Sequence, residues 1–389
     1  MSRPPVELAG IVRQHGAEYR RRHNLPRDHL RLLHAIEVCR TAALGGHVER
    51  CGHCQHEHIS YNSCRNRHCP KCQSMARAQW LAARQAELLP VEYFHIVFTL
   101  PEQIAAIAFH NKKAVYNLLF QAAAQTLLTI ARDPKHLGAH IGFFSILHTW
   151  GQNLQHHPHL HCVVPGGGLS EDRQQWIAGR PGFFLPVRVL SRLFRRLFLQ
   201  ALRHSYQQGQ LHFYSGLEPL QDLAAFNHYL APLKKLDWVV YAKPPFGGPH
   251  QVLEYLGRYT HRVAISNQRL LAHDGERVSF SWKDYRHHNK TKTMSLTAEE
   301  FLRRFLLHAL PRGFQRIRHY GLLANRHRRR NLILCRHLLS VPEPPSDEAP
   351  PSTTASTTPA TESFHRCPLC GGPMSIIQLL RPAWSFDSS

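Results

Sequence analysis

Residues 156–168 read HHPHLHCVVPGGG and place several histidines directly before an apolar run that ends in glycines. In a β-strand, side chains two residues apart point to the same face of the sheet. A strand here would set His159 beside His161 and turn Leu160 into the core. Two imidazoles on one face can bind a single metal ion. Because the chain contains 31 histidines, the spacing alone also fits an ordinary pair of surface or core-edge histidines.

A metal ion at this pair would need a third protein ligand. Imidazoles suit zinc, nickel or copper better than magnesium, but Mg²⁺ or Mn²⁺ can bind where oxygen ligands, waters and a phosphate complete the shell. The candidates for the third ligand are His148 on the preceding predicted strand, His157 and Gln155. The sequence does not choose among them.

The composition favours a polyanionic partner. Lys and Arg number 48 against 26 Asp and Glu, which gives a net charge of +22. A field of this sign favours nucleic acid first and an anionic membrane second. No run of 18 apolar residues and no signal-peptide pattern is found, so we expect a cytoplasmic, nucleoid-associated protein without a spanning helix.

Half of the ten cysteines fall in residues 51–72, CGHCQHEHISYNSCRNRHCPKC. Cys51 with Cys54 and Cys69 with Cys72 form two C-x-x-C knuckles, and four thiolates at this spacing are typical of a structural zinc site. Cys64 and the neighbouring histidines are alternative ligands. The competing interpretation is a redox pair or free cysteines.

Two further groups accompany this block. Arg65, Arg67 and Lys71 lie between or beside the knuckles, where a zinc module could aim them at phosphates. A separate knuckle, Cys367 with Cys370, lies near the C-terminus and is half of a second possible zinc site. His365 could be its third ligand, and a fourth is not visible.

The pattern of periodicity predicts an α+β protein with four segments. Apolar spacing favours helices over 75–90, 103–132, 190–206 and 250–262, and strands over 91–101, 141–151, 158–168 and 236–243. Two runs around AHDGE predict a hairpin over 263–285, and Thr297 with Glu300 forms a capping box. The predicted segments are a helical, zinc-binding and DNA-binding domain (1–90), a catalytic domain (91–335), a disordered Pro/Ser/Thr-rich linker (336–363) and a short tail (364–389).

The stretch EYLGRYTHR, residues 254–262, sets Tyr255 and Tyr259 four residues apart. On a helix the two rings share one face, and such a pair is more often core packing than chemistry. Arg258 and Arg262 surround the pair with positive charge. A tyrosine hydroxyl has an ordinary pKa near 10, so it becomes a competent nucleophile only beside a polarised phosphate.

Four motifs together resemble the two-tyrosine rolling-circle transposases of bacterial insertion sequences, members of the HUH (His-hydrophobic-His) endonuclease superfamily. The matching stretches are SCRNRHCPKCQ (63–73), HHPHLHCVVPGGG (156–168), YLGRYTHRVAIS (255–266) and FLRRFLLHALPRGFQRIRHYGLL (301–323). They span about 50–325, most of the chain. The C-terminal knuckle has no counterpart in this pattern.

The resemblance implies more than the spacing does. It implies an HUH-type central antiparallel sheet flanked by helices, preceded by a small helical, zinc-ribbon-like domain. His159 and His161 would hold a catalytic Mg²⁺ or Mn²⁺ ion, and Tyr255 and Tyr259 would be the nucleophiles. The substrates would be single-stranded DNA at the ends of a mobile element and target DNA, cleaved through a 5′-phosphotyrosine.

Further residues are assigned to DNA by charge. The basic run at 312–332, including Arg316 and Arg318, fits a phosphate-binding surface, as do Arg258 and Arg262. The chain has no G-x-x-x-x-G-K-[ST] loop, so unwinding would require a host helicase. Two other functions stay open: a plasmid or phage rolling-circle replication initiator or relaxase, and a non-catalytic zinc-dependent DNA-binding regulator.

Overall fold

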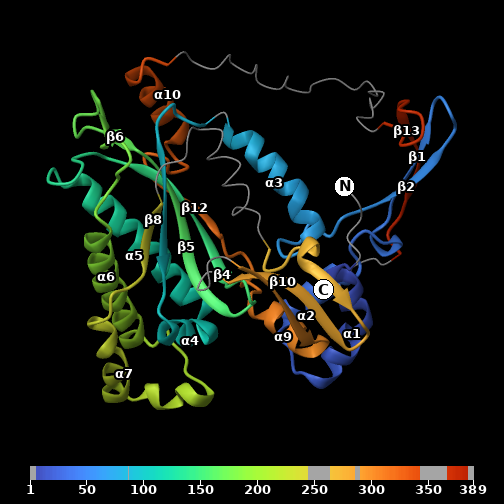
Figure 1. The fold of residues 1–389 in the computed structure, drawn as a ribbon, viewed down its shortest axis with the longest axis horizontal. Helices are drawn as coiled ribbons and strands as arrows, with labels where there is room; N and C mark the ends of the chain where they lie inside the picture. Colours follow the sequence, from blue (N-terminus) through green and yellow to red (C-terminus); the bar gives the residue numbers. More distant parts are fainter. Residues whose placement is uncertain (1–5, 86, 244–262, 285–289, 342–365, 384–389) are drawn as a thin grey trace.

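The computed structural model describes residues 6–85, 87–243, 263–284, 290–341 and 366–383 (Figure 1). Its helices are α1 Leu8–Arg22, α2 Arg27–Glu37, α3 Pro70–Gln85, α4 Glu102–His110, α5 Lys112–Arg132, α6 Val187–Gln207, α7 Leu223–Leu230, α9 Ala298–Leu307 and α10 Arg328–Leu338. Its strands are β1 Gly46–Cys51, β2 Glu57–Tyr61, β3 Tyr93–Thr99, β4 Gly142–Trp150, β5 His156–Pro165, β6 Gly167–Leu169, β7 Trp176–Ala178, β8 Val240–Lys243, β9 Leu270–His273, β10 Arg277–Asp284, β11 Lys290–Thr297, β12 Ile317–Gly321 and β13 Met374–Leu380.

A five-stranded antiparallel sheet is the centre of the molecule. Its strand order is β12-β4-β5-β3-β8, so β5 with its histidines is the middle strand. Strands β4 and β5 are buried along almost their whole length, because both faces of the sheet are covered. The α+β prediction with a central antiparallel sheet flanked by helices is confirmed.

The two faces of β5 carry different side chains. Leu160, Cys162 and Val164 point into the large core formed with α4, α5 and α6. Val163 points to the other face, into a smaller cluster that Trp80 of α3 helps to cover. Figure 1 shows α5 and α6 on one side of the sheet and α3 on the other. By the strand's alternation, His159 and His161 lie on the α3 side.

A second body packs beside the sheet. Helices α1, α2 and α9 enclose an apolar core with the antiparallel strands β9, β10 and β11. Helix α9 begins at the predicted capping box, where Thr297 Oγ1 accepts a hydrogen bond from Glu300 N at 3.3 Å. Trp150 and Leu154, at the end of β4 and in the turn to β5, belong to the same core and join the two bodies.

Two element predictions differ from the structure. The segment 103–132 is not one helix but α4 and α5, separated at Asn111, whose buried side chain bonds Ile107 O and the backbone of His212. The predicted hairpin around residues 274–276 exists, but its first strand begins only at Leu270. The predicted helix over 250–262 lies outside the described residues.

Helix α5 is long and apolar enough to cross a membrane by length and composition alone. However, 67% of its most apolar window is buried inside the protein. This burial is what a core helix packed between a sheet and α6 requires, so the helix is weak evidence for a membrane span.

Candidate metal centre, cysteine clusters and basic surfaces

Three histidines converge on the α3 side of the sheet. His148 on β4 lies directly opposite His159 on β5, and His161 follows two residues later on the same face. One ring nitrogen from each histidine lies within 4.8 Å of the others. His148 and His161 are buried, at 2% and 7% exposure, whereas His159 is half-buried and open to a substrate.

Hydrogen bonds orient two of these rings. His159 Nδ1 lies 2.7 Å from the carbonyl oxygen of His157, which can only accept, so Nδ1 carries the proton and Nε2 is left to bind a metal. His161 Nδ1 lies 2.8 Å from Nε2 of His95 on β3, and the two rings are parallel within 5°. We assign the proton of this pair to His161 Nδ1, which likewise directs Nε2 into the cluster.

The structure therefore separates the three candidates for the third ligand. His148 joins His159 and His161, as the register of β4 and β5 requires. His157 contributes its backbone carbonyl to His159 rather than a ring to the cluster. Gln155 lies in an exposed position in the turn before β5.

His95 was missed by the sequence reasoning. It is a polar residue inside the apolar strand YFHIVFT, and it is only 2% exposed. A buried histidine in a strand predicted to flank the histidine pair is the signal that could have identified it, because ligating histidines usually donate their second ring N–H to a neighbour.

The donor set fits a metal ion. Three neutral imidazoles on two adjacent strands supply one side of a coordination shell and leave the other side to phosphate oxygens and water. The predicted nucleophiles Tyr255 and Tyr259 lie outside the described residues, so the structure does not place them relative to the histidines.

The structure divides the cysteines predicted as one zinc site into two clusters. Cys69 and Cys72 meet Cys64 and also Cys39, which the sequence reasoning missed. Cys51 and Cys54 meet instead the C-terminal knuckle, Cys367 and Cys370. The reason is geometric: β1 and β2 carry the first knuckle away on a separate hairpin, while the second knuckle begins α3.

The first cluster has the dimensions of a zinc site. The Cys72 sulfur lies 3.6 Å from that of Cys39 and 3.5 Å from that of Cys64. Tetrahedral zinc with Zn–S bonds of about 2.3 Å places its sulfurs roughly 3.8 Å apart. Hydrogen bonds from the thiols of Cys39, Cys64 and Cys69 hold the pKa of Cys72 well below its usual value, which favours the thiolate that binds metal.

Comparison with known proteins agrees with this arrangement. Residues 11–100 match the family model described as "Transposase zinc-binding domain", of IS91 type, and residues 142–331 match the one described as "Putative transposase". The chain is 59% identical over 384 residues to "Putative transposase y4qJ" of Sinorhizobium fredii (strain NBRC 101917 / NGR234), covering 97% of this chain and 96% of the relative. The chain belongs to the IS91-type transposase family.

A more distant relative carries the same description. The chain is 29% identical over 361 residues to "Transposase for insertion sequence element IS801" of Pseudomonas savastanoi pv. phaseolicola, covering 87% of this chain and 80% of the relative. The resemblance to two-tyrosine transposases with an N-terminal zinc-binding domain is thereby confirmed. The cysteine clusters and the zinc-binding family model together support structural zinc.

The transposase carries a basic pocket beside its first cysteine cluster. Arg31, Arg65, Arg67 and Arg312 line a cavity of about 480 Å³. Arg67 also donates to the carbonyl oxygen of Phe314, which fixes its position. This pocket brings the predicted Arg65 and Arg67 together with part of the basic run that begins at residue 312.

The other predicted DNA contacts are engaged within the fold. Lys71 forms an ion pair with Glu7 at 2.7 Å. Arg316 donates to Gln73 Oε1 at 3.0 Å, and burial lowers the pKa of its guanidinium to about 10. Arg318 donates to an asparagine and lies over the ring of Phe120 at 4.2 Å, because β12 is an edge strand of the sheet rather than a solvated tail. Residues 258 and 262 lie outside the described residues.

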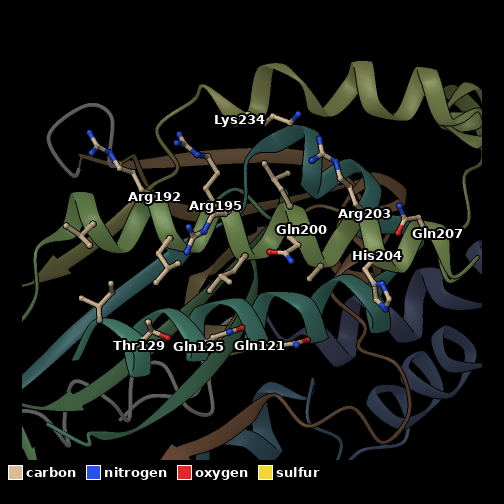
Figure 2. A pocket seen from close by; sticks show the side chains of 17 residues that line it. Gln121, Gln125, Thr129, Arg192, Arg195, Gln200, Arg203, His204, Gln207 and Lys234 are labelled. Carbon is tan, nitrogen blue, oxygen red and sulfur yellow. The ribbon is translucent and has the colours of Figure 1, made fainter. Parts of the chain in front are cut away.

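A second basic surface lies over the helical face of the sheet. Figure 2 shows a groove between α5 and α6 whose labelled side chains are cationic or carry amides. Its cationic lining residues are Arg192, Arg195, Arg196, Arg203 and Lys234. No carboxylate lines this groove among the described residues, and the buried Nε of Arg203 has no hydrogen-bond partner there. The groove is therefore a concentration of uncompensated positive charge.

Proposed function

We propose that this transposase cleaves and rejoins single-stranded DNA at the ends of a mobile element, in rolling-circle transposition through a 5′-phosphotyrosine. The observation that carries the proposal is the convergence of His148, His159 and His161 on the central strands of the sheet. A DNA-binding regulator has no use for three imidazoles directed at one point.

The histidines would hold the metal and present the scissile phosphate to it. A bound Mg²⁺ or Mn²⁺ ion supplies Lewis-acid polarisation of that phosphate. His159 is the half-buried member of the cluster and lies nearest to solvent, whereas His161 is held from behind by His95. The chain thus fixes the ligand nitrogens before DNA arrives, which limits the reorganisation needed for reaction.

Tyr255 and Tyr259 are the proposed nucleophiles. The phenol oxygen of one tyrosine attacks phosphorus, the bond from phosphorus to the 3′ oxygen breaks, and the proton lost by the phenol ends on that 3′ oxygen. The products are a 5′-phosphotyrosine and a free 3′-hydroxyl, so the bond energy is retained for rejoining. A second tyrosine serves the cleavage at the other end.

The basic surfaces are proposed to hold the DNA backbone. The arginine-lined pocket beside the first cysteine cluster and the groove between α5 and α6 both lack the carboxylates that would neutralise them, apart from Asp28 in the former. Phosphate contacts of this kind bind DNA without reading its sequence. A host helicase would supply the single strand, and the enzyme would act in the cytoplasm.

Two alternatives make different predictions. A replication initiator or relaxase would use the same histidines and tyrosines on a fixed origin, and the transposase relatives argue against it. A zinc-dependent regulator would bind duplex DNA and cut nothing.

The test is covalent capture of DNA. Purified protein, Mn²⁺ and a labelled single-stranded oligonucleotide carrying an element end should give an adduct that survives denaturation. The adduct should disappear when His159 or His161 is replaced by alanine. An adduct of undiminished yield in both alanine variants would refute the histidine assignment.

A further inference from the structure

The C-terminal tail of the chain is built into the N-terminal part of the structure. Strand β13 pairs antiparallel with β1 from Gly46 opposite Leu380 to Cys51 opposite Met374. Figure 1 shows the red β13 beside the blue β1 and β2, at a corner of the molecule away from the main sheet. Two segments more than 300 residues apart in sequence therefore form one small sheet.

The knuckle that precedes β13 meets the knuckle that follows β1. The Cys51 sulfur lies 3.4 Å from that of Cys370, and the Cys54 sulfur lies 3.5 Å from that of Cys367. All four sulfurs lie within 4.8 Å of one another, close to the spacing of about 3.8 Å that tetrahedral zinc imposes. Two C-x-x-C turns facing each other satisfy the ligand count and type of a closed structural zinc site.

The backbone around these sulfurs fits the same interpretation. The amide of Gly52 in the first knuckle donates to Pro373 O in the tail at 3.0 Å. A Cβ at Gly372 would lie 2.8 Å from His53 Nδ1 and 3.2 Å from the Cys51 sulfur. The tail turn thus packs directly against the first knuckle, and any side chain at residue 372 would separate them.

Apolar burial is too small to hold the tail. The buried cluster at this site contains only Cys51, Cys367 and Met374 among the described residues. Farther along β13, Ile376 is 47% exposed and Leu379 is 76% exposed. A strand that buries so little apolar surface does not offset the entropy of its own ordering, so another interaction must fix it.

We propose that Cys51, Cys54, Cys367 and Cys370 bind one zinc ion, which fastens the C-terminal tail to the N-terminal zinc-binding domain as its third strand. The transposase then binds two zinc ions per chain, one at this site and one at Cys39 and its three partners. The knuckle outside the catalytic pattern is thereby half of a shared site rather than an independent one.

The test is zinc content measured by mass spectrometry of the full-length protein. Wild-type protein should contain two zinc ions per chain. Replacing Cys51 and Cys54 by serine, replacing Cys367 and Cys370 by serine, or replacing all four should each leave one. Equal loss from every combination is the signature of a shared site. Leu369→Ser, at a residue 73% exposed between the two tail cysteines, is the matched control and should keep two.

Two results would overturn the proposal. One is two zinc ions in the variant that lacks both tail cysteines, and the other is additive loss, in which the quadruple variant contains fewer ions than either double variant. Replacing Cys39 and Cys64 by serine should remove the other ion and leave the shared one.

Hydrogen exchange gives a second readout that does not count metal. The amides of β13 should lose protection in the Cys51→Ser, Cys54→Ser variant, although that variant leaves the tail sequence intact. Protection that persists at the wild-type level would mean that strand pairing alone holds the tail, and the zinc staple would be refuted.

Discussion

His95 offers the sharpest test of how the metal centre is organised. Its Nε2 lies 2.8 Å from His161 Nδ1, and both residues are buried, so water cannot readily replace the bond. We predict that His95→Phe lowers the affinity of the histidine cluster for Mn²⁺ by tenfold to a hundredfold. The reason is that His161 loses the acceptor that fixes its proton on Nδ1 and directs Nε2 at the metal.

The magnitude follows from the kind of bond that is lost. Removing a second ligand-orienting partner behind a metal-bound histidine typically costs about 10–100-fold in metal affinity, which corresponds to roughly 1.4–2.7 kcal/mol. Phenylalanine retains the ring and fills the same buried space, so the loss reports the hydrogen bond rather than a cavity. His95→Gln, whose amide oxygen can accept from Nδ1, should recover part of the affinity.

The assay is titration of Mn²⁺ by calorimetry on protein whose cysteine sites are loaded with zinc. Tyr93→Phe is the matched control, because Tyr93 lies two residues away on the same face of β3 and its hydroxyl accepts only from Leu89 N among the described hydrogen bonds. That variant should bind Mn²⁺ like the wild type. Wild-type Mn²⁺ affinity in folded His95→Phe would refute the positioning role.

Two further predictions concern charge. Hydrogen bonds from Arg303, with Arg304, lower the pKa of Glu300 from its usual 4.5 to about 2, so the carboxylate stabilises the fold above pH 4.5 and this stability is lost as the pH falls toward 2. Glu300→Gln should lower the free energy of unfolding by about 1 kcal/mol at pH 7 after solvent screening, and an equal loss at pH 3 would contradict this. Replacing Arg192 and Arg196 by glutamine should reduce the salt dependence of single-stranded DNA binding, by roughly 0.7 in slope per phosphate contact, whereas exposed Arg180→Gln should not.

The local sequence was sufficient to predict the central sheet and its histidines. Strict alternation in HHPHLH sets His159 and His161 on one face, and the short connection from β4 predicts the antiparallel pair that brings His148 opposite His159. The capping box at Thr297 is likewise a local pattern and is found as expected. Each of these predictions depends on residues that are close in sequence.

The sequence reasoning failed where the pairing is long-range. Nothing near Cys51 indicates that its partners lie at residues 367 and 370, because two C-x-x-C knuckles can combine in several ways and proximity in sequence favours the wrong one. The same limit hid Cys39, which precedes the cysteine block, and His95, whose role depends on the pairing of β3 with β5.

Basic residues show a different limit. Composition predicts a surface for nucleic acid but not which arginines face it. Arg318 is occupied by an aromatic ring and an asparagine, whereas Arg203 lines an open groove that charge counting alone did not single out. Only packing distinguishes the two.

The central claim is that this transposase forms a covalent bond from tyrosine to DNA. The most direct measurement is a denaturing gel of protein incubated with Mn²⁺ and a labelled single-stranded element end, comparing the wild type with the Tyr255→Phe, Tyr259→Phe double variant. The wild type should give a labelled adduct, each single variant should give less, and the double variant should give none while still binding the oligonucleotide. An adduct of wild-type yield in the double variant, or no adduct from wild-type protein that demonstrably binds the DNA, would contradict the proposed chemistry.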